Sequence, residues 1–166
     1  MKFGTFLYLF ISKNLMMKKI VLIFIIGLIF SCTKSFETSD FYRNFEDNRW
    51  AFNKEVTFDF ELKKNQEFWV HFGHIYNYNF ASVPIELEFV KENDTLNKIV
   101  VNEKIIIKDN NGEDKGDCLG DICDVYQKLD KDLEPGNYKL SIRNLSELPY
   151  LPNVLGIGYQ IRKPKE

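Results

Sequence analysis

Residues that usually build active sites and metal centres are scarce in this sequence. Its 166 residues include only two histidines and three cysteines. The histidines, His71 and His74, stand three positions apart in a segment predicted to be a strand, where such residues point to opposite faces. We therefore expect both to be structural and not to share a metal ion. No Gly-x-Ser-x-Gly motif or glycine-rich nucleotide loop is present, so we predict no catalytic residue and no cofactor, and a protein that is not an enzyme.

A membrane-spanning run and an excess of basic residues are also lacking. The two apolar runs, 3–11 and 20–30, are each shorter than the roughly 20 residues that a membrane-spanning helix requires. The chain has 22 basic and 24 acidic residues, and residues 1–31 contain four of the basic residues and no acid. Residues 32–166 therefore hold 18 basic and 24 acidic residues, which argues against a nucleic-acid partner.

The second apolar run has the form of a signal peptide that ends at a cysteine. Residues 16–19 (MMKK) are a basic start, and residues 28–32 (LIFSC) place a small residue before Cys32. This resembles a bacterial lipoprotein signal, in which the cysteine thiol receives a diacylglycerol and the chain is cut before it. We predict a signal peptide over 1–31, with 1–15 as an upstream extension, because Met17 by itself starts a complete signal. The alternative is an ordinary cleaved signal with an incidental cysteine.

Cys32 is therefore the predicted lipidation site, carrying palmitate-type acyl chains that hold the protein on a membrane. Residues 32–48 are polar with isolated aromatics and are predicted to be a lipidated tether, which leaves 49–166 for the folded domain. The residues directly after Cys32 (TKSFE) lack the tight acidic run that resembles surface-export signals. The expected location is the cell envelope, with the lipid in the inner leaflet of the outer membrane and the domain facing the periplasm.

The body of the chain has the patterns of β-structure. Apolar and polar residues alternate in four segments, as in strands with one buried face: 56–62, 83–89, 138–142 and 155–161. Two further segments, 67–74 and 98–107, are apolar on both faces and are predicted to be more central strands. Only 121–131 is compatible with a turn or two of helix. Short strands separated by turn residues predict an all-β fold, an antiparallel β-sandwich of jelly-roll type.

Residues 109–124 form an acidic connection with three glycines and six acids. Oxygen-rich loops suit calcium. However, an EF-hand frame that starts at Asp109 has Asp114 where glycine is required and Gly120 where glutamate is required. Solvated turn residues are the simpler interpretation, and we predict no metal site.

Two cysteines, Cys118 and Cys123, remain in this connection once Cys32 is lipidated. A disulfide is chemically reasonable outside the cytoplasm. Free thiols are the alternative, and zinc would need two further ligands that the neighbouring sequence does not supply.

The segment 69–80 is dense in aromatic residues and asparagine. It fits a sandwich core followed by a polar loop. It also fits a glycan-binding surface, because exposed aromatic rings stack on sugars. The two hypotheses differ in whether Trp69, Tyr76 and Tyr78 form one exposed platform.

Taken in order, these features resemble the GldH family of gliding-motility lipoproteins of the Bacteroidetes. The resemblance covers roughly residues 30–163, and its most specific part is the loop 115–124 (KGDCLGDICD) followed by 134–138 (EPGNY). It implies an envelope lipoprotein without catalysis, required for surface gliding and associated with the type IX secretion apparatus. The implied partners are other gliding and secretion proteins of the envelope. A glycan-binding lipoprotein remains the alternative function.

The loop 115–124 is the candidate contact with such a partner, because its glycines permit tight turns and its apolar residues lie among acids. The candidate residues are Gly116, Leu119, Gly120, Asp121, Ile122 and Asp124. A modification site is also predicted at Thr95, because Asp94-Thr95-Leu96 is similar to the O-glycosylation sequon of Bacteroidetes envelope proteins and is expected to lie in a turn between strands.

Overall fold

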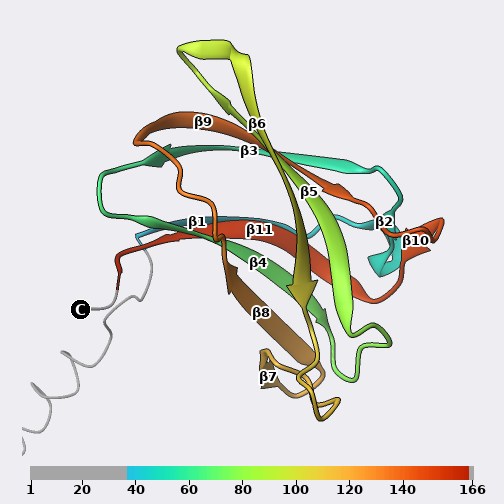
Figure 1. The fold of residues 1–166 in the computed structure, drawn as a ribbon. Coiled ribbons are helices and arrows are strands. Elements are labelled where there is room, and N and C mark those ends of the chain that lie inside the picture. Colours follow the sequence, from blue (N-terminus) through green and yellow to red (C-terminus); the bar gives the residue numbers. More distant parts are fainter. Residues whose placement is uncertain (1–36, 165–166) are drawn as a thin grey trace, which may run out of the picture. The chain divides into compact units, whose positions relative to one another are not determined.

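The computed structural model describes residues 37–164, which form strands joined by short connections (Figure 1). One short 3-10 helix, η1 (Glu46–Asn48), follows the first strand. The strands are β1 (Thr38–Tyr42), β2 (Trp50–Ala51), β3 (Glu55–Leu62), β4 (Glu67–Ile75), β5 (Ser82–Lys91), β6 (Asp94–Ile106), β7 (Asp117–Leu119), β8 (Ile122–Lys128), β9 (Gly136–Asn144), β10 (Tyr150–Leu151) and β11 (Val154–Arg162). No helix in the described range is long and apolar enough to cross a membrane.

The strands form antiparallel sheets, so the fold is all-β as expected. A five-stranded sheet has the order β1-β11-β4-β8-β7, and a four-stranded sheet has the order β3-β9-β5-β6. The short strands β2 and β10 pair with each other. Each ladder is antiparallel.

The two larger sheets pack face to face around an aromatic core. The ring of Phe60 on β3 lies 5.3 Å from that of Phe68 on β4, and Phe68 lies 5.2 Å from Phe89 on β5. Phe58 on β3 contacts Tyr159 on β11 at 5.6 Å. All three contacts cross from one sheet to the other. The Phe68–Phe89 and Phe58–Tyr159 pairs are edge-to-face, and such pairs stabilise a core beyond simple burial. The arrangement fits the expected β-sandwich.

The four segments with clean alternation are strands in the structure. In β3, for example, every second residue is buried, from Val56 to Leu62. The apolar segment 67–74 is β4, which lies between β11 and β8 as a central strand should. The segment 98–107 was expected to be central, but its residues 98–106 lie in β6, which is the last strand of its sheet. Val100 and Ile106 on the outer face of β6 are exposed.

Two other segments differ from expectation. Thr38–Tyr42, which we placed in the tether, is β1 and pairs with β11 over its whole length. Its residues are exposed or half-buried, so the sequence has no hydrophobic alternation there, and backbone pairing defines the strand. Residues 122–128, within the segment compatible with helix, form β8 because the chain pairs with β4 from Ile122 to Lys128.

Candidate interaction site

The candidate contact loop is a β-hairpin at the edge of the five-stranded sheet. Strands β7 and β8 pair from Asp117↔Asp124 to Leu119↔Ile122, which leaves a two-residue turn of Gly120 and Asp121. Gly120 has φ +62°. Two-residue hairpin turns that match strand twist need such a positive φ, which glycine adopts without steric cost. The sequence around Gly120 therefore specifies a tight and well-defined tip.

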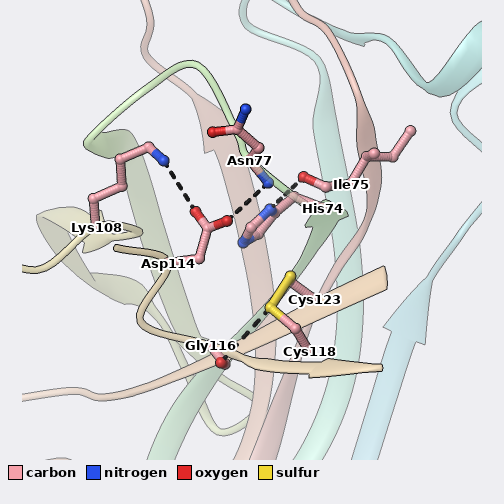
Figure 2. Close-up of a disulfide and its surroundings, with 8 residues drawn as sticks. All are labelled: His74, Ile75, Asn77, Lys108, Asp114, Gly116, Cys118 and Cys123. Carbon is pink, nitrogen blue, oxygen red and sulfur yellow. Dashed lines mark hydrogen bonds and ion pairs between the residues drawn. A yellow bond between two sulfur atoms is a disulfide. The ribbon is translucent and has the colours of Figure 1, made fainter. Parts of the chain in front are cut away.

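A disulfide between Cys118 and Cys123 crosses this hairpin (Figure 2). The two residues are direct partners in the β7–β8 ladder, with their Cα atoms 4.0 Å apart. Cys123, on β8, is fully buried, whereas Cys118, on β7, is exposed. The bond therefore ties the short outer strand β7 to a strand that is anchored in the sheet.

Three large apolar side chains are exposed around the turn. The exposed fraction is 88% for Leu119 and 54% for both Ile122 and Tyr76. Leu119 and Ile122 are partners in the β7–β8 ladder, so their side chains lie on the same face, and the backbone of Tyr76 lies beside the turn, where its N–H donates to the carbonyl of Asp121 at 2.9 Å. We call Tyr76, Leu119 and Ile122 the tip patch. Clustered exposed apolar side chains of this kind are typical of contact surfaces.

The base of the hairpin is fixed by Asp114, whose side chain is only 4% exposed. Its carboxylate accepts hydrogen bonds from Lys108 Nζ at 3.2 Å and from the backbone N–H of Asn77 at 2.8 Å (Figure 2). A Cβ atom at Gly116 would come within 2.7 Å of the Asp124 carbonyl, so only glycine allows the chain to pass β8 at this point. Asp114 and Gly116 thus position the hairpin against the loop that carries Tyr76.

Several acids of the connection serve the local fold. Asp109 accepts the backbone N–H groups of Asn111 and Glu113 at 2.8 and 3.0 Å, closing a small loop. Asp124 bonds to His71 at 2.7 Å. Within residues 37–164, no group of three or more His, Cys, Asp or Glu side chains is placed to hold a metal ion.

The two histidines lie on opposite faces of β4, as predicted from their spacing. His71 is on the outer face of its sheet, stacked between the rings of Phe41 at 4.1 Å and Tyr126 at 4.4 Å. His74 points into the core beside Tyr78 at 5.0 Å and bonds through Nδ1 to the Ile75 carbonyl at 2.9 Å. Nε2 of His74 has no hydrogen-bond partner in the described residues.

Burial lowers the pKa of His71 below its usual value, and the hydrogen bond to Asp124 only partly opposes this effect. The folded state therefore binds fewer protons than the unfolded state just below pH 6.5, so stability rises with pH through this window. Acidification from about pH 7 to about pH 5.5 should reduce the free energy of unfolding, and the loss reaches about 1.4 kcal/mol for each pKa unit of difference once the histidine is protonated in the folded state as well.

His71→Gln should remove this part of the pH dependence, because an amide can donate to Asp124 but does not titrate in this range. Urea denaturation of both proteins at the two pH values measures the difference. Equal pH dependence in the two proteins would contradict the assignment.

The three aromatic residues proposed as a sugar platform do not share one exposed surface. Tyr78 is 2% exposed and packs in the core, and burial raises its pKa. Trp69 lies on the outer face with the Arg162 guanidinium 4.3 Å from its ring. Only Tyr76 is open to solvent, and it belongs to the tip patch.

Some residues that shape the site were not identified from the sequence. Asp114 looks like one acid among six, and nothing local signals that it is the buried one. Phe41, which covers His71, lies in a segment without strand periodicity. Tyr76 was noted only as part of an aromatic segment, and its place beside the hairpin follows from the pairing of β4 with β8.

Comparison with known proteins gives a family match and weak structural likenesses. Residues 37–161 match the GldH lipoprotein family. No curated protein matches the chain. Among solved structures, the dimeric latent PorU from Porphyromonas gingivalis is similar over 80% of this chain and 14% of that chain, with 10% identity and a TM-score of 0.28, a likeness on which we base no argument. The matched range runs from before β1 to the last residue but one of β11, and the chain belongs to the GldH lipoprotein family.

Proposed function

We propose that this protein is anchored by lipid at Cys32 to the periplasmic face of the outer membrane and serves gliding motility or type IX secretion as a non-catalytic accessory component. Family membership supports a role related to gliding motility and a lipid-anchored place in the envelope. The lipoprotein-like signal that ends at Cys32 supports the anchor. Cys32 itself lies outside the described residues.

The tip patch is the observation that carries the mode of action, which is contact with another envelope protein. Leu119 and Ile122 lie on a hairpin that the Cys118–Cys123 bond pre-orders. An ordered loop loses less conformational entropy on binding than a mobile one, so more of the contact energy appears as affinity. A rigid apolar tip suits protein contact better than catalysis.

Leu119→Asp combined with Ile122→Asp should abolish spreading and secretion of type IX cargo in a gliding host, as deletion of the protein should. Burying two charges in an apolar contact is costly, whereas on the free protein both side chains already face solvent. Phe52→Asp combined with Leu148→Asp is the matched control, because these apolar side chains are 50% and 41% exposed and lie outside the β7–β8 hairpin. Colony spreading, cargo secretion and abundance of the folded protein are the measurements.

The outcomes of this experiment separate the hypotheses. A deletion strain that glides and secretes normally but grows poorly on one polysaccharide would favour glycan binding. If deletion abolishes gliding and the charged hairpin variant glides normally, the functional role stands and the tip patch is not the contact. A defect in the control with Phe52→Asp and Leu148→Asp equal to that of the hairpin variant would also remove the tip patch from consideration.

Strand order supports assignment of the fold to the jelly-roll type. Apart from the short strands β2, β7 and β10, the order is β1-β11-β4-β8 in one sheet and β3-β9-β5-β6 in the other. Of the connections between these eight strands, each leads from one sheet to the other except the β5–β6 hairpin. The first strand, β1, pairs with the last, β11. Two four-stranded sheets wound in this nested way are the arrangement of a jelly roll.

O-glycosylation of Thr95 also remains a proposal. The structure does not place Asp94–Leu96 in the expected turn, because the turn is Glu92-Asn93 and these three residues are the first of β6. Mass spectrometry of the native protein is the test, and an unmodified Thr95 peptide would end the hypothesis.

A further inference from the structure

Strand β6 leaves one side of its backbone without a neighbouring strand. It pairs with β5 on one side and is the last strand of its sheet (Figure 1). In an antiparallel ladder, alternate residues direct both N–H and C=O to the same side. Ile107 N–H donates toward β5, to the Ala81 carbonyl at 2.9 Å, whereas Ile106 N–H donates away from β5. The register runs unbroken from Lys98 to Ile106, so the even-numbered residues of this stretch face the free side.

A side-chain amide covers one end of this free edge. Gln127 of β8 accepts the N–H of Ile106 at 2.9 Å and donates from Nε2 to the carbonyl of Lys104 at 3.0 Å. Its carboxamide therefore occupies the place that a peptide group of another strand would take. Between residues 37 and 164, no such partner reaches the N–H or C=O of Lys98, Val100 or Asn102. These three residues form the uncovered part of the edge.

A groove of about 780 Å³ lies beside the uncovered part. Ile99, Val101, Phe89 and Tyr138 supply its apolar floor, and the segment 131–134 lines it together with β6. Three lysines and three acids surround it, so its charges balance. Natural sheets usually protect a long edge with bulges, prolines or short strands. Here, Val100 on the edge is 51% exposed and no proline interrupts β6.

We propose that the edge of β6 from Lys98 to Asn102 binds an extended segment of another polypeptide as an added strand. The segment carries no net charge and has apolar residues at alternate positions. Strand addition draws its affinity from main-chain hydrogen bonds and its specificity from pockets for alternate side chains, and the edge and the groove provide both. The balanced charge of the rim favours an uncharged segment. Because residues 131–134 line the same groove as β6, the space suits a single strand better than the sheet of a second folded copy. The proposal is independent of the tip patch, which lies on other strands.

A synthetic peptide tests the proposal directly. The probe is fluorescently labelled acetyl-Thr-Val-Thr-Val-Thr-Val-Thr-amide, and its control is the same peptide N-methylated at every valine and threonine, which cannot donate to the edge in either strand orientation. Both are titrated into the full chain in detergent and followed by fluorescence anisotropy. Hydrogen exchange of Lys98, Val100 and Asn102 is measured in parallel. We expect the unmethylated peptide to bind at least about tenfold more tightly and to slow exchange at these three amides by a similar factor.

Variants of the protein locate the site. Val100→Pro removes only an N–H that faces the free side, which edge strands tolerate, and Val100→Thr keeps that N–H. We expect Val100→Pro to weaken binding at least about tenfold and Val100→Thr to leave it within about twofold. Thermal unfolding shows whether both variants fold. If Val100→Pro does not, the comparison of the two peptides and the exchange data still decide the matter.

Four results with the peptides would overturn the proposal. They are absence of peptide binding, equal binding of the N-methylated peptide, equal binding by two folded Val100 variants, and protection of residues other than 98–102. Protection of 98–102 without peptide that rises with protein concentration would also overturn it, in favour of a second copy. Tighter binding of the same peptide with its two outer threonines replaced by lysine, or by glutamate, would contradict the uncharged character of the segment.

Discussion

Replacing Gly158 with alanine is expected to displace β1 and to lower the free energy of unfolding by about 3 kcal/mol, at the upper end of the usual cost of overpacking. Gly158 lies in β11 opposite Phe41 of β1. A Cβ atom at this position would lie 2.0 Å from the carbonyl oxygen of Asp40 and 2.8 Å from Phe41 Cα. Both are backbone atoms, so no side-chain rotation relieves the overlap. The strand itself must move and give up pairing between Thr38 and Tyr42.

Gly73→Ala is the matched control, because it makes the same substitution on the same sheet. Its closest contact would be the tip of the Phe41 ring at 2.9 Å, a side chain that can shift. We expect it to cost less than about 1 kcal/mol. Urea denaturation gives both free energies, and hydrogen exchange at 38–42 reports the release of β1. Equal costs for the two variants, or unchanged exchange at 38–42, would show that β1 does not depend on Gly158.

The strands that could be predicted from the sequence are those with one buried and one solvated face. In β3 and β5, a regular alternation from Val56 and from Val83 reports this condition directly. Such a pattern fixes which face is buried, but it does not fix which strand lies beside which. The position of β6 at an edge could therefore not be predicted, because its apolar outer residues resemble those of a buried strand.

The segment that precedes β2 shows the opposite case. Thr38–Tyr42 have no alternation and look like a tether, yet they complete the five-stranded sheet. The neighbouring strand β11 makes room for β1, because Gly156 and Gly158 have no side chains that would overlap its backbone. An isolated glycine inside a strand often marks such a close approach, so Gly156 and Gly158 were the usable signal.

The candidate site was predictable in part for a similar reason. Gly120, Leu119 and Ile122 could be identified because a hairpin tip is a local feature of sequence. Tyr76 and Asp114 could not, because they reach the hairpin through β4 and through a separate loop. Contacts between distant segments depend on strand order, which a single sequence does not reveal.

Replacing Cys32 with alanine should abolish membrane attachment, which is the largest effect on location that we expect. Each acyl chain contributes on the order of 10 kcal/mol to membrane partitioning, at about 0.8 kcal/mol for each buried CH₂. The acyl chains at Cys32 are the membrane attachment that we propose for this protein. In detergent phase separation, the native protein should enter the detergent phase and the Cys32→Ala variant the aqueous phase. Palmitate labelling should disappear in the variant.

A variant with Cys118→Ser and Cys123→Ser is the matched control, because it removes the other two cysteines of the chain. The disulfide lies in the β7–β8 hairpin, so its loss should loosen residues 117–123 and leave the lipid in place. Palmitate labelling and partitioning should therefore equal those of the native protein. Labelling that persists in Cys32→Ala would contradict the assignment of the anchor. Digestion of the native protein by protease added to intact cells would instead place the domain on the cell surface, since a domain that faces the periplasm is shielded by the outer membrane.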